Sequence, residues 1–293
     1  MHHRTAKSTI KAALIFMLLL ALVAGLAACG SKTTSTTSKP ATTNPPTTAE
    51  NTATTAAPSP AAGAKLTISA ASSLKAAFND IGAAFDAANG STTTFNFDAS
   101  GTLQKQIESG APVDIFASAS PKQVNALLEK KLMDADSVKD FAGNEIVIIV
   151  PANSTLGITS FEDLTKAEVK KISYGDPQAA PHGVAAEEIL TNLKLMDQVK
   201  PKVIYAANAS QTMEYVASGE VDAAIAFASE AISGGDKIKV VATSKPEWHN
   251  TIVYPLGIVS DSKNKAAAQA FIDFVLSPSG QSILEKYGFK PAP

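Results

Sequence analysis

The chain has 293 residues, 45% of them hydrophobic, with a formal net charge of −2 and a single cysteine. A mildly acidic chain without a basic stripe is poorly suited to nucleic acid, so the charge argues against a DNA- or RNA-binding role. The lone Cys29 excludes an internal disulfide.

Residues 1–28 have the pattern of a bacterial secretory signal. Three basic residues precede an apolar run over residues 12–28, and small residues come just before Cys29. The basic residues are Arg4, Lys7 and Lys11. The run ends in a sequence that resembles a lipobox, Leu26-Ala27-Ala28-Cys29-Gly30, so we expect Cys29 to be lipidated and to begin the mature chain. The alternative is a plain transmembrane anchor with an incidental cysteine. If the signal is cleaved, the three basic residues are lost with it and the net charge of the chain falls to about −5.

Residues 29–64 form a tract of Ser, Thr, Ala and Pro with no aromatic and no large aliphatic side chain. Such a segment cannot bury enough apolar surface to offset its chain entropy, so it predicts a disordered tether. A tether of this length spans roughly 30 Å root-mean-square. We expect it to hold a folded domain away from a membrane.

From Lys65 to Pro293 the pattern alternates between strands and helices. The expected strands are 65–69, 93–97, 113–116, 145–150, 171–174, 202–205, 221–227 and 252–259. The expected helices are 74–89, 103–109, 121–130, 181–195, 210–218, 266–276 and 279–287. The apolar run 145–150 is typical of a strand buried on both faces of a parallel sheet. The alternation predicts an α/β fold with mostly parallel sheets, in one large or two smaller lobes, and ligands beyond the carboxyl ends of the strands.

Four segments each end an expected strand and open an expected helix with small or hydroxyl residues. They are Ser69-Ala70-Ala71-Ser72-Ser73-Leu74, Phe97-Asp98-Ala99-Ser100-Gly101-Thr102-Leu103, Pro181-His182-Gly183 and Asn208-Ala209-Ser210. A helix start leaves backbone N–H groups unpaired and carries the positive end of the helix dipole. Several such starts aimed at one point would bind a small anion without lysine or arginine.

Each candidate residue also has a plainer interpretation. Ser73 and Ser100 could be helix N-caps, although a serine suits an anion because its hydroxyl and its backbone N–H both donate. An acidic residue there would repel the anion. The neighbours of His182 indicate a turn, where a histidine is usually solvated, and no partner for a zinc site is near in sequence. Asp114 and Asp176 fit backbone caps better than paired catalytic acids.

These residues belong to a wider set of motifs, in one order and spacing. The chain from Lys65 onward resembles the molybdate-binding proteins of bacterial ABC importers along nearly its whole length. The motifs that carry the resemblance are Ala70-Ala71-Ser72-Ser73-Leu74, Phe97 to Leu103, Gly110-Ala111-Pro112-Val113-Asp114-Ile115-Phe116-Ala117-Ser118-Ala119, Gly175-Asp176-Pro177 with Pro181-His182-Gly183, and Tyr287-Gly288-Phe289.

The resemblance implies a two-lobed periplasmic-binding-protein fold of type 2. Each lobe would be a mostly parallel sheet flanked by helices, and two crossing strands would join the lobes. Lobe 1 would comprise residues 65–142 plus 254–293, and lobe 2 residues 143–253. Residues 145–150 and 252–259 would hold the hinge.

The resemblance also implies a ligand set, one residue at a time. Ser73 and Ser100 match two serines whose hydroxyl and backbone N–H both bond the oxyanion. His182 and Ala209 match positions that donate a backbone N–H, and the imidazole of His182 could also face the anion. Phe227 stands where the family has a tyrosine hydroxyl. These residues would contact molybdenum only through the oxyanion, with no bare metal ion and no cofactor.

The implied function is capture of molybdate or tungstate and delivery to an ABC permease with its ATPase. The protein would be a non-enzymatic monomer, lipid-anchored at the outer side of the cell membrane, in a periplasm or on the face of a single membrane. Alternatives are a receptor for another small oxyanion or a ligand sensor on the same fold. An extracytoplasmic enzyme is disfavoured because no nucleophile elbow, phosphate loop or His-Glu-x-x-His motif occurs.

Overall fold

A computed structural model describes residues 61–293, which fall in one compact unit containing two five-stranded sheets. The expected signal segment, Cys29 and nearly all of the expected tether lie outside the described residues. Within the described part of the chain, no helix is both long and apolar enough to cross a membrane.

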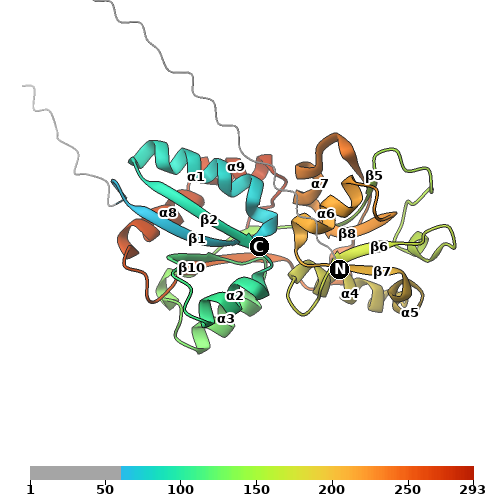
Figure 1. The fold of residues 1–293 in the computed structure, drawn as a ribbon, viewed down its shortest axis with the longest axis horizontal. Helices are drawn as coiled ribbons and strands as arrows, with labels where there is room; N and C mark the ends of the chain where they lie inside the picture. Colours follow the sequence, from blue (N-terminus) through green and yellow to red (C-terminus); the bar gives the residue numbers. More distant parts are fainter. Residues whose placement is uncertain (1–60) are drawn as a thin grey trace, which may run out of the picture. The chain divides into compact units, whose positions relative to one another are not determined.

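The first sheet has the strand order β2-β1-β3-β10-β4, and Figure 1 labels its strands β1, β2 and β10. Its strands are β1 (Lys65–Ala71), β2 (Thr92–Asp98), β3 (Ile115–Ala117), β4 (Lys139–Gly143) and β10 (Val253–Ile258). One face carries α1 (Lys75–Asn89), α8 (Lys265–Leu276) and α9 (Pro278–Lys286), and the other carries α2 (Ser100–Glu108) and α3 (Pro121–Glu129). Apolar residues recur at helical spacing in α1 and are buried: Phe78, Ile81 and Phe85 are at most 1% exposed. Gly90 then ends that helix in a left-handed conformation.

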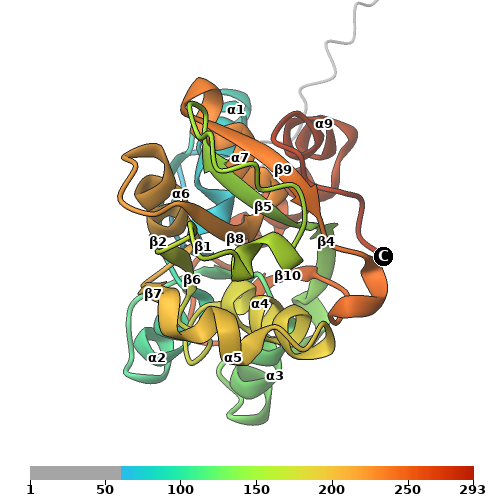
Figure 2. The ribbon, with the colours of Figure 1, turned by 90° about the vertical axis from the view of Figure 1, so that its right-hand side faces the viewer.

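The second sheet repeats this order as β7-β6-β8-β5-β9. Its strands are β5 (Ile146–Pro151), β6 (Ile172–Gly175), β7 (Val203–Ala206), β8 (Ala223–Phe227) and β9 (Ile238–Thr243). Helices α4 (Pro181–Asn192) and α5 (Met196–Val199) lie on one side, and α6 (Ala209–Ala217) and α7 (Ala228–Gly234) on the other (Figure 2). Both sheets thus have helices on both faces, which is the α/β class expected from the sequence.

Each sheet contains one strand that runs against the others. β10 is antiparallel to β3 and β4, and β5 is antiparallel to β8 and β9. The expectation that residues 145–150 lie in a parallel pairing is therefore wrong. Burial produced the apolar run, and burial does not depend on strand direction.

The chain passes from one sheet to the other twice. It does so between Gly143 and Ile146, and again between Thr243 and Val253. The two passages give the two-lobed arrangement with crossing segments. The lobe limits at 142/143 and 253/254 stay a prediction.

Candidate functional site

The carboxyl ends of the parallel strands of both sheets meet around one small cavity of about 10 Å³. The residues that line it come from both lobes: Ala71, Ser72, Ser73, Asp98, Ala99, Ser100, Ala119, Ala180, Pro181, His182, Ala209 and Phe227. A space of that volume accommodates about one water molecule. The five residues named by the family resemblance are all among them.

Four helix starts point to this cavity, as the sequence predicts. Ser72 opens a short 3₁₀ turn, η1 (Ser72–Leu74), that leads into α1, and Ser100 is the first residue of α2. From the second lobe, His182 lies in the first turn of α4 and Ala209 is the first residue of α6. N–H groups in a first helical turn have no acceptor within their own helix, so this arrangement concentrates donors and positive dipole ends.

Ser100 is completely buried and its hydroxyl has a defined direction. Its Oγ accepts a hydrogen bond from the N–H of Ala119 at 3.0 Å. Because a backbone N–H can only donate, Ser100 Oγ must accept there, and the hydroxyl hydrogen remains to donate to a bound group.

Ser73 is 4% exposed and its Oγ lies 3.0 Å from the hydroxyl oxygen of Tyr254. Tyr254 belongs to β10 and also accepts from the side-chain amide of Asn144 at 3.2 Å. Sequence reasoning missed Tyr254 and Asn144 because they lie 181 and 71 residues from Ser73, and neither stands in a helix-start motif. No local signal could have found them.

His182 corrects the expectation of a solvated turn histidine. It lies inside α4 and is 1% exposed, with Nε2 2.9 Å from the hydroxyl of Thr212. That hydroxyl donates to the carbonyl of Asn208, so Nε2 carries the proton and donates to Thr212. Burial lowers the pKa of His182 to about 3, so the imidazole is neutral. The ring joins the starts of α4 and α6, and its polar edge is occupied there.

Ala209 N–H is engaged by the other lobe. It donates to Ser72 Oγ at 3.0 Å, and Ser210 Oγ donates to the carbonyl of Ser72 at 3.3 Å. The N–H of Gly101 likewise donates to Ala179 across the lobes at 2.9 Å. A side chain at Gly101 would meet the Ala179 carbonyl at 2.8 Å, so this close approach needs glycine. The two lobes are therefore hydrogen-bonded to each other around the cavity.

Phe227 ends β8 and is 1% exposed. Its ring centroid lies 5.4 Å from that of His182 and 5.8 Å from that of Tyr254. The ring closes one wall of the cavity with apolar carbon and brings no hydrogen-bond donor.

Asp98 is the acidic residue of the lining, and the sequence analysis gave it no role of its own. Its Oδ1 accepts from the N–H of Ala99 at 2.7 Å and from the amide of Asn208, on the other lobe, at 3.2 Å. None of the residues that line the cavity is a lysine or an arginine. Any anion held here is therefore bound by neutral donors beside one hydrogen-bonded carboxylate.

Comparison with known proteins shows the family to which this fold belongs. The family model of bacterial extracellular solute-binding proteins matches residues 66–290. The chain belongs to this family. YvgL of Bacillus subtilis strain 168, by name a substrate-binding lipoprotein of an ABC transporter, is 38% identical over 76% of this chain and 85% of its own length. The molybdate-binding protein ModA of Escherichia coli strain K12 is 31% identical over 77% of this chain and 88% of its own.

A solved substrate-binding domain from Clostridium difficile, named for a molybdenum ABC transporter, is 40% identical. It superposes with a TM-score of 0.63 and covers 78% of this chain and all of its own. The solute-binding protein thus has the two-lobed fold of its relatives, and like them it is not an enzyme.

One buried acid of the solute-binding protein follows a lining residue of the cavity in the sequence. Glu230, in the first turn of α7 three residues after Phe227, is 2% exposed. Burial, and secondarily the charge of Glu214, raises its pKa to about 8, and Lys75 opposes this only in part. Glu230 is therefore mostly protonated at neutral pH, which avoids a second negative charge beside the cavity.

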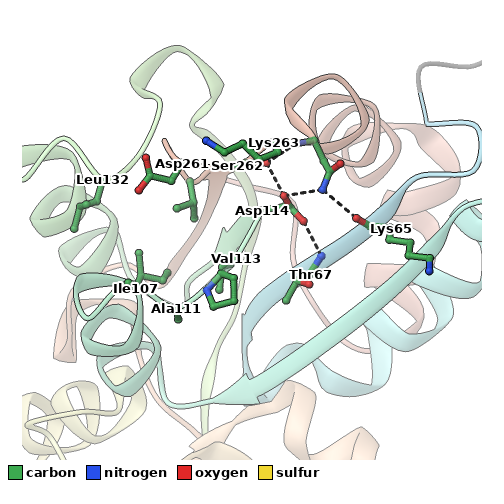
Figure 3. A pocket seen from close by; sticks show the side chains of 14 residues that line it. Lys65, Thr67, Ile107, Ala111, Val113, Asp114, Leu132, Asp261, Ser262 and Lys263 are labelled. Atoms are coloured by element: carbon green, nitrogen blue, oxygen red, sulfur yellow. Dashed lines mark hydrogen bonds between the residues drawn. The ribbon is translucent and has the colours of Figure 1, made fainter.

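The amino-terminal edge of the first sheet carries a larger groove of about 460 Å³, which Figure 3 shows. Its main polar group is Asp114, which accepts from Thr67 N, Ser262 Oγ and Asn264 Nδ2 at 2.9, 2.6 and 3.2 Å. These bonds tie β1 to β3 and to the segment after β10. Asp114 thus has the structural role that the sequence favours, as does Asp176, whose Oδ1 accepts from Gln178 N.

In the described part of the chain, no group of three or more His, Cys, Asp and Glu residues could hold a metal ion.

Proposed function

We propose that this solute-binding protein captures one molybdate or tungstate ion between its lobes and delivers it to an ABC permease and its ATPase. The observation that carries the proposal is the convergence of four helix starts and two buried serines, Ser73 and Ser100, on one cavity without a basic side chain. A tetrahedral dianion offers only acceptors, so a site made of donors suits it. Relatives named for molybdate support the choice of anion.

In this proposal, Ser73 and Ser100 bind the anion through their hydroxyl and backbone N–H groups, and His182 and Ala209 through backbone N–H groups alone. Phe227 packs against it. Entry of the anion would displace Ser72 from the N–H of Ala209. Sulfate is smaller than molybdate, so donors placed for the larger anion would be too far from its oxygens and leave hydrogen bonds unmade.

Thermal unfolding of the purified chain tests the choice of anion. A ligand that binds only the folded state raises the melting temperature with its concentration relative to the dissociation constant. We expect millimolar molybdate and tungstate to raise it, and sulfate to raise it far less. A shift with sulfate or phosphate and none with molybdate or tungstate would refute the proposed specificity.

A second candidate is a receptor for a protonated oxyanion such as hydrogen phosphate. Asp98 favours it, because a carboxylate at the cavity can accept a hydrogen bond from an anion that carries a proton. A dianion without a proton meets only repulsion there. The phosphate arm of the thermal experiment separates the two candidates.

We also propose that Cys29 is lipidated and that residues 29–64 tether the protein to the outer side of the membrane. The relative YvgL carries the word lipoprotein in its name, which supports the anchor. Cys29→Ser should move the protein from the membrane fraction to the soluble fraction. Continued fractionation with detergent would support an uncleaved segment at residues 12–28 instead.

A further inference from the structure

Tyr254 lies at the end of the first sheet that borders the cavity. In β10, Leu256 pairs with Ala117, the last residue of β3, so Tyr254 lies beyond the carboxyl end of that strand. The residue is completely buried. Its hydroxyl reaches Ser73, a residue of the cavity lining, although Tyr254 itself is not part of that lining.

The direction of the hydrogen bonds around Tyr254 follows from Asn144. Asn144 Oδ1 accepts from the N–H of Glu145 at 2.9 Å, which turns its amide nitrogen toward Tyr254 and Ser229, at 3.2 and 2.9 Å. An amide nitrogen only donates, so the Tyr254 oxygen accepts from it. The phenolic hydrogen is then directed to its other neighbour, Ser73 Oγ, at 3.0 Å. Burial raises the pKa of Tyr254, so this hydrogen is retained.

Ser73 is thereby placed as Ser100 is. Ser100 Oγ accepts from a backbone N–H, and Ser73 Oγ accepts from the Tyr254 hydroxyl. In both cases the serine oxygen accepts a hydrogen bond from the protein, and the serine hydrogen is left to donate to a group in the cavity. The two serines differ in the group that donates to them. Ser100 accepts from a backbone N–H, whereas Ser73 accepts from the side chain of Tyr254, which is itself oriented by Asn144 at the passage between the lobes.

We propose that Tyr254 is a positioning residue for anion binding, which directs the hydroxyl of Ser73 into the cavity as a donor while Asn144 fixes the direction of the relay. The inference rests on the proposed function, since it concerns how the same site binds its anion. Through Asn144 and Ser229 the relay also joins the first lobe to α7 of the second. Ser73 and Tyr254 both belong to the first lobe, so contact between the lobes affects Ser73 only through the direction that Asn144 gives the relay.

The ring of Tyr254 has a separate packing role. It contacts the rings of Phe141, Phe227 and Phe289 at centroid distances of 6.2, 5.8 and 5.3 Å. Tyr254→Phe preserves these contacts and removes only the hydroxyl, so the substitution isolates the relay.

Calorimetric titration of the full chain with molybdate tests the role. Tyr254→Phe should weaken binding about tenfold, because the Ser73 hydroxyl that it leaves undirected then loses its hydrogen bond to the charged ligand. Tyr174→Phe, at a buried tyrosine of β6 outside the relay, is the matched control and should bind like the wild type. Asn144→Leu, which removes the directing amide at similar volume, should weaken binding severalfold.

Combining Tyr254→Phe with each of the two serine variants distinguishes a positioning role from a general loss of structure. In a Ser73→Ala chain the substitution should have no further effect, because the hydroxyl that it directs is gone. In a Ser100→Ala chain it should again weaken binding about tenfold. A merely structural role would lower affinity in every background.

Wild-type affinity in Tyr254→Phe and Asn144→Leu, or an equal loss with and without Ser73, would overturn the positioning role alone. Absence of molybdate binding in the wild-type chain would overturn the proposed function, and the positioning role with it.

Discussion

The two lobes have the same strand order and bring different chemistry to the cavity. The first lobe contributes hydroxyl side chains, Ser72, Ser73 and Ser100, each with its oxygen already hydrogen-bonded. The second contributes helix starts whose side chains are turned away or apolar, at His182, Ala209 and Phe227. In our account the side chains of the first lobe therefore set affinity, whereas the second lobe acts through backbone that most substitutions leave in place.

The largest loss of affinity is expected in the first lobe. Ser73→Ala and Ser100→Ala each remove one hydrogen bond to a charged ligand, worth roughly 1.5–3 kcal/mol, and should weaken molybdate binding by about ten- to a hundredfold. Calorimetric titration measures this. Ser69→Ala, at a buried serine of β1 outside the cavity lining, is the control and should bind normally. Unchanged affinity in both variants would remove the distinction between the lobes.

Phe227→Tyr tests whether the second lobe can be given a side-chain donor. If the ring stands at the position where the family resemblance implies a tyrosine hydroxyl, the added hydroxyl should tighten molybdate binding by roughly tenfold. The gain should be smaller for sulfate, whose oxygens lie farther from the wall. A buried hydroxyl that finds no partner would instead cost about 1–3 kcal/mol of stability at unchanged affinity. Melting temperature and dissociation constant measured on the same variant separate these outcomes.

His182→Ala should change affinity much less, within about threefold, because the proposed contact is the backbone N–H. Its main effect is on stability, since deleting a completely buried ring costs about 2–5 kcal/mol.

The pKa of His182 in the folded protein, about 3, lies below the usual 6.5, so the wild type loses stability as pH falls from 6.5 toward 3. The stability gap to the variant should narrow by up to roughly 1.4 kcal/mol per pH unit below 6.5. Denaturant unfolding at several pH values would measure it, and a constant gap would contradict a buried neutral imidazole.

The smallest effect on affinity at neutral pH is expected for Glu230→Gln, which keeps the shape of the protonated acid. The folded pKa of about 8 lies above the usual 4.5, so the wild type loses stability as pH rises between these values. The variant should thus be more stable than the wild type at pH 7, and equally stable below pH 4.5. Above pH 8, molybdate binding should weaken in the wild type and not in the variant. Equal pH profiles for the two proteins would refute this role.

The local sequence pattern predicted the α/β class, most elements and the four helix starts, because helix periodicity and helix-start signals depend on neighbouring residues. It did not predict β4, β9, α5 or α7. Strands β4 and β9 are edge strands whose exposed positions carry charged residues, such as Lys139 and Lys239, so they lack the continuous apolar run of a buried strand.

The site was predicted unevenly for the same reason. Candidate serines stand in motifs that the sequence shows. The buried imidazole of His182 is hydrogen-bonded to Thr212, 30 residues away, and the relay to Ser73 depends on Tyr254, 181 residues away. Such contacts are made by tertiary packing, and no local pattern encodes them.

Calorimetric titration of the purified chain with molybdate, tungstate, sulfate and phosphate tests the central claim most directly. We predict one molybdate or tungstate bound per chain, far weaker sulfate binding, and loss of most of the molybdate affinity in the Ser73→Ala, Ser100→Ala double variant. Tight binding of sulfate or phosphate in place of molybdate, or full molybdate affinity in the double variant, would contradict the account.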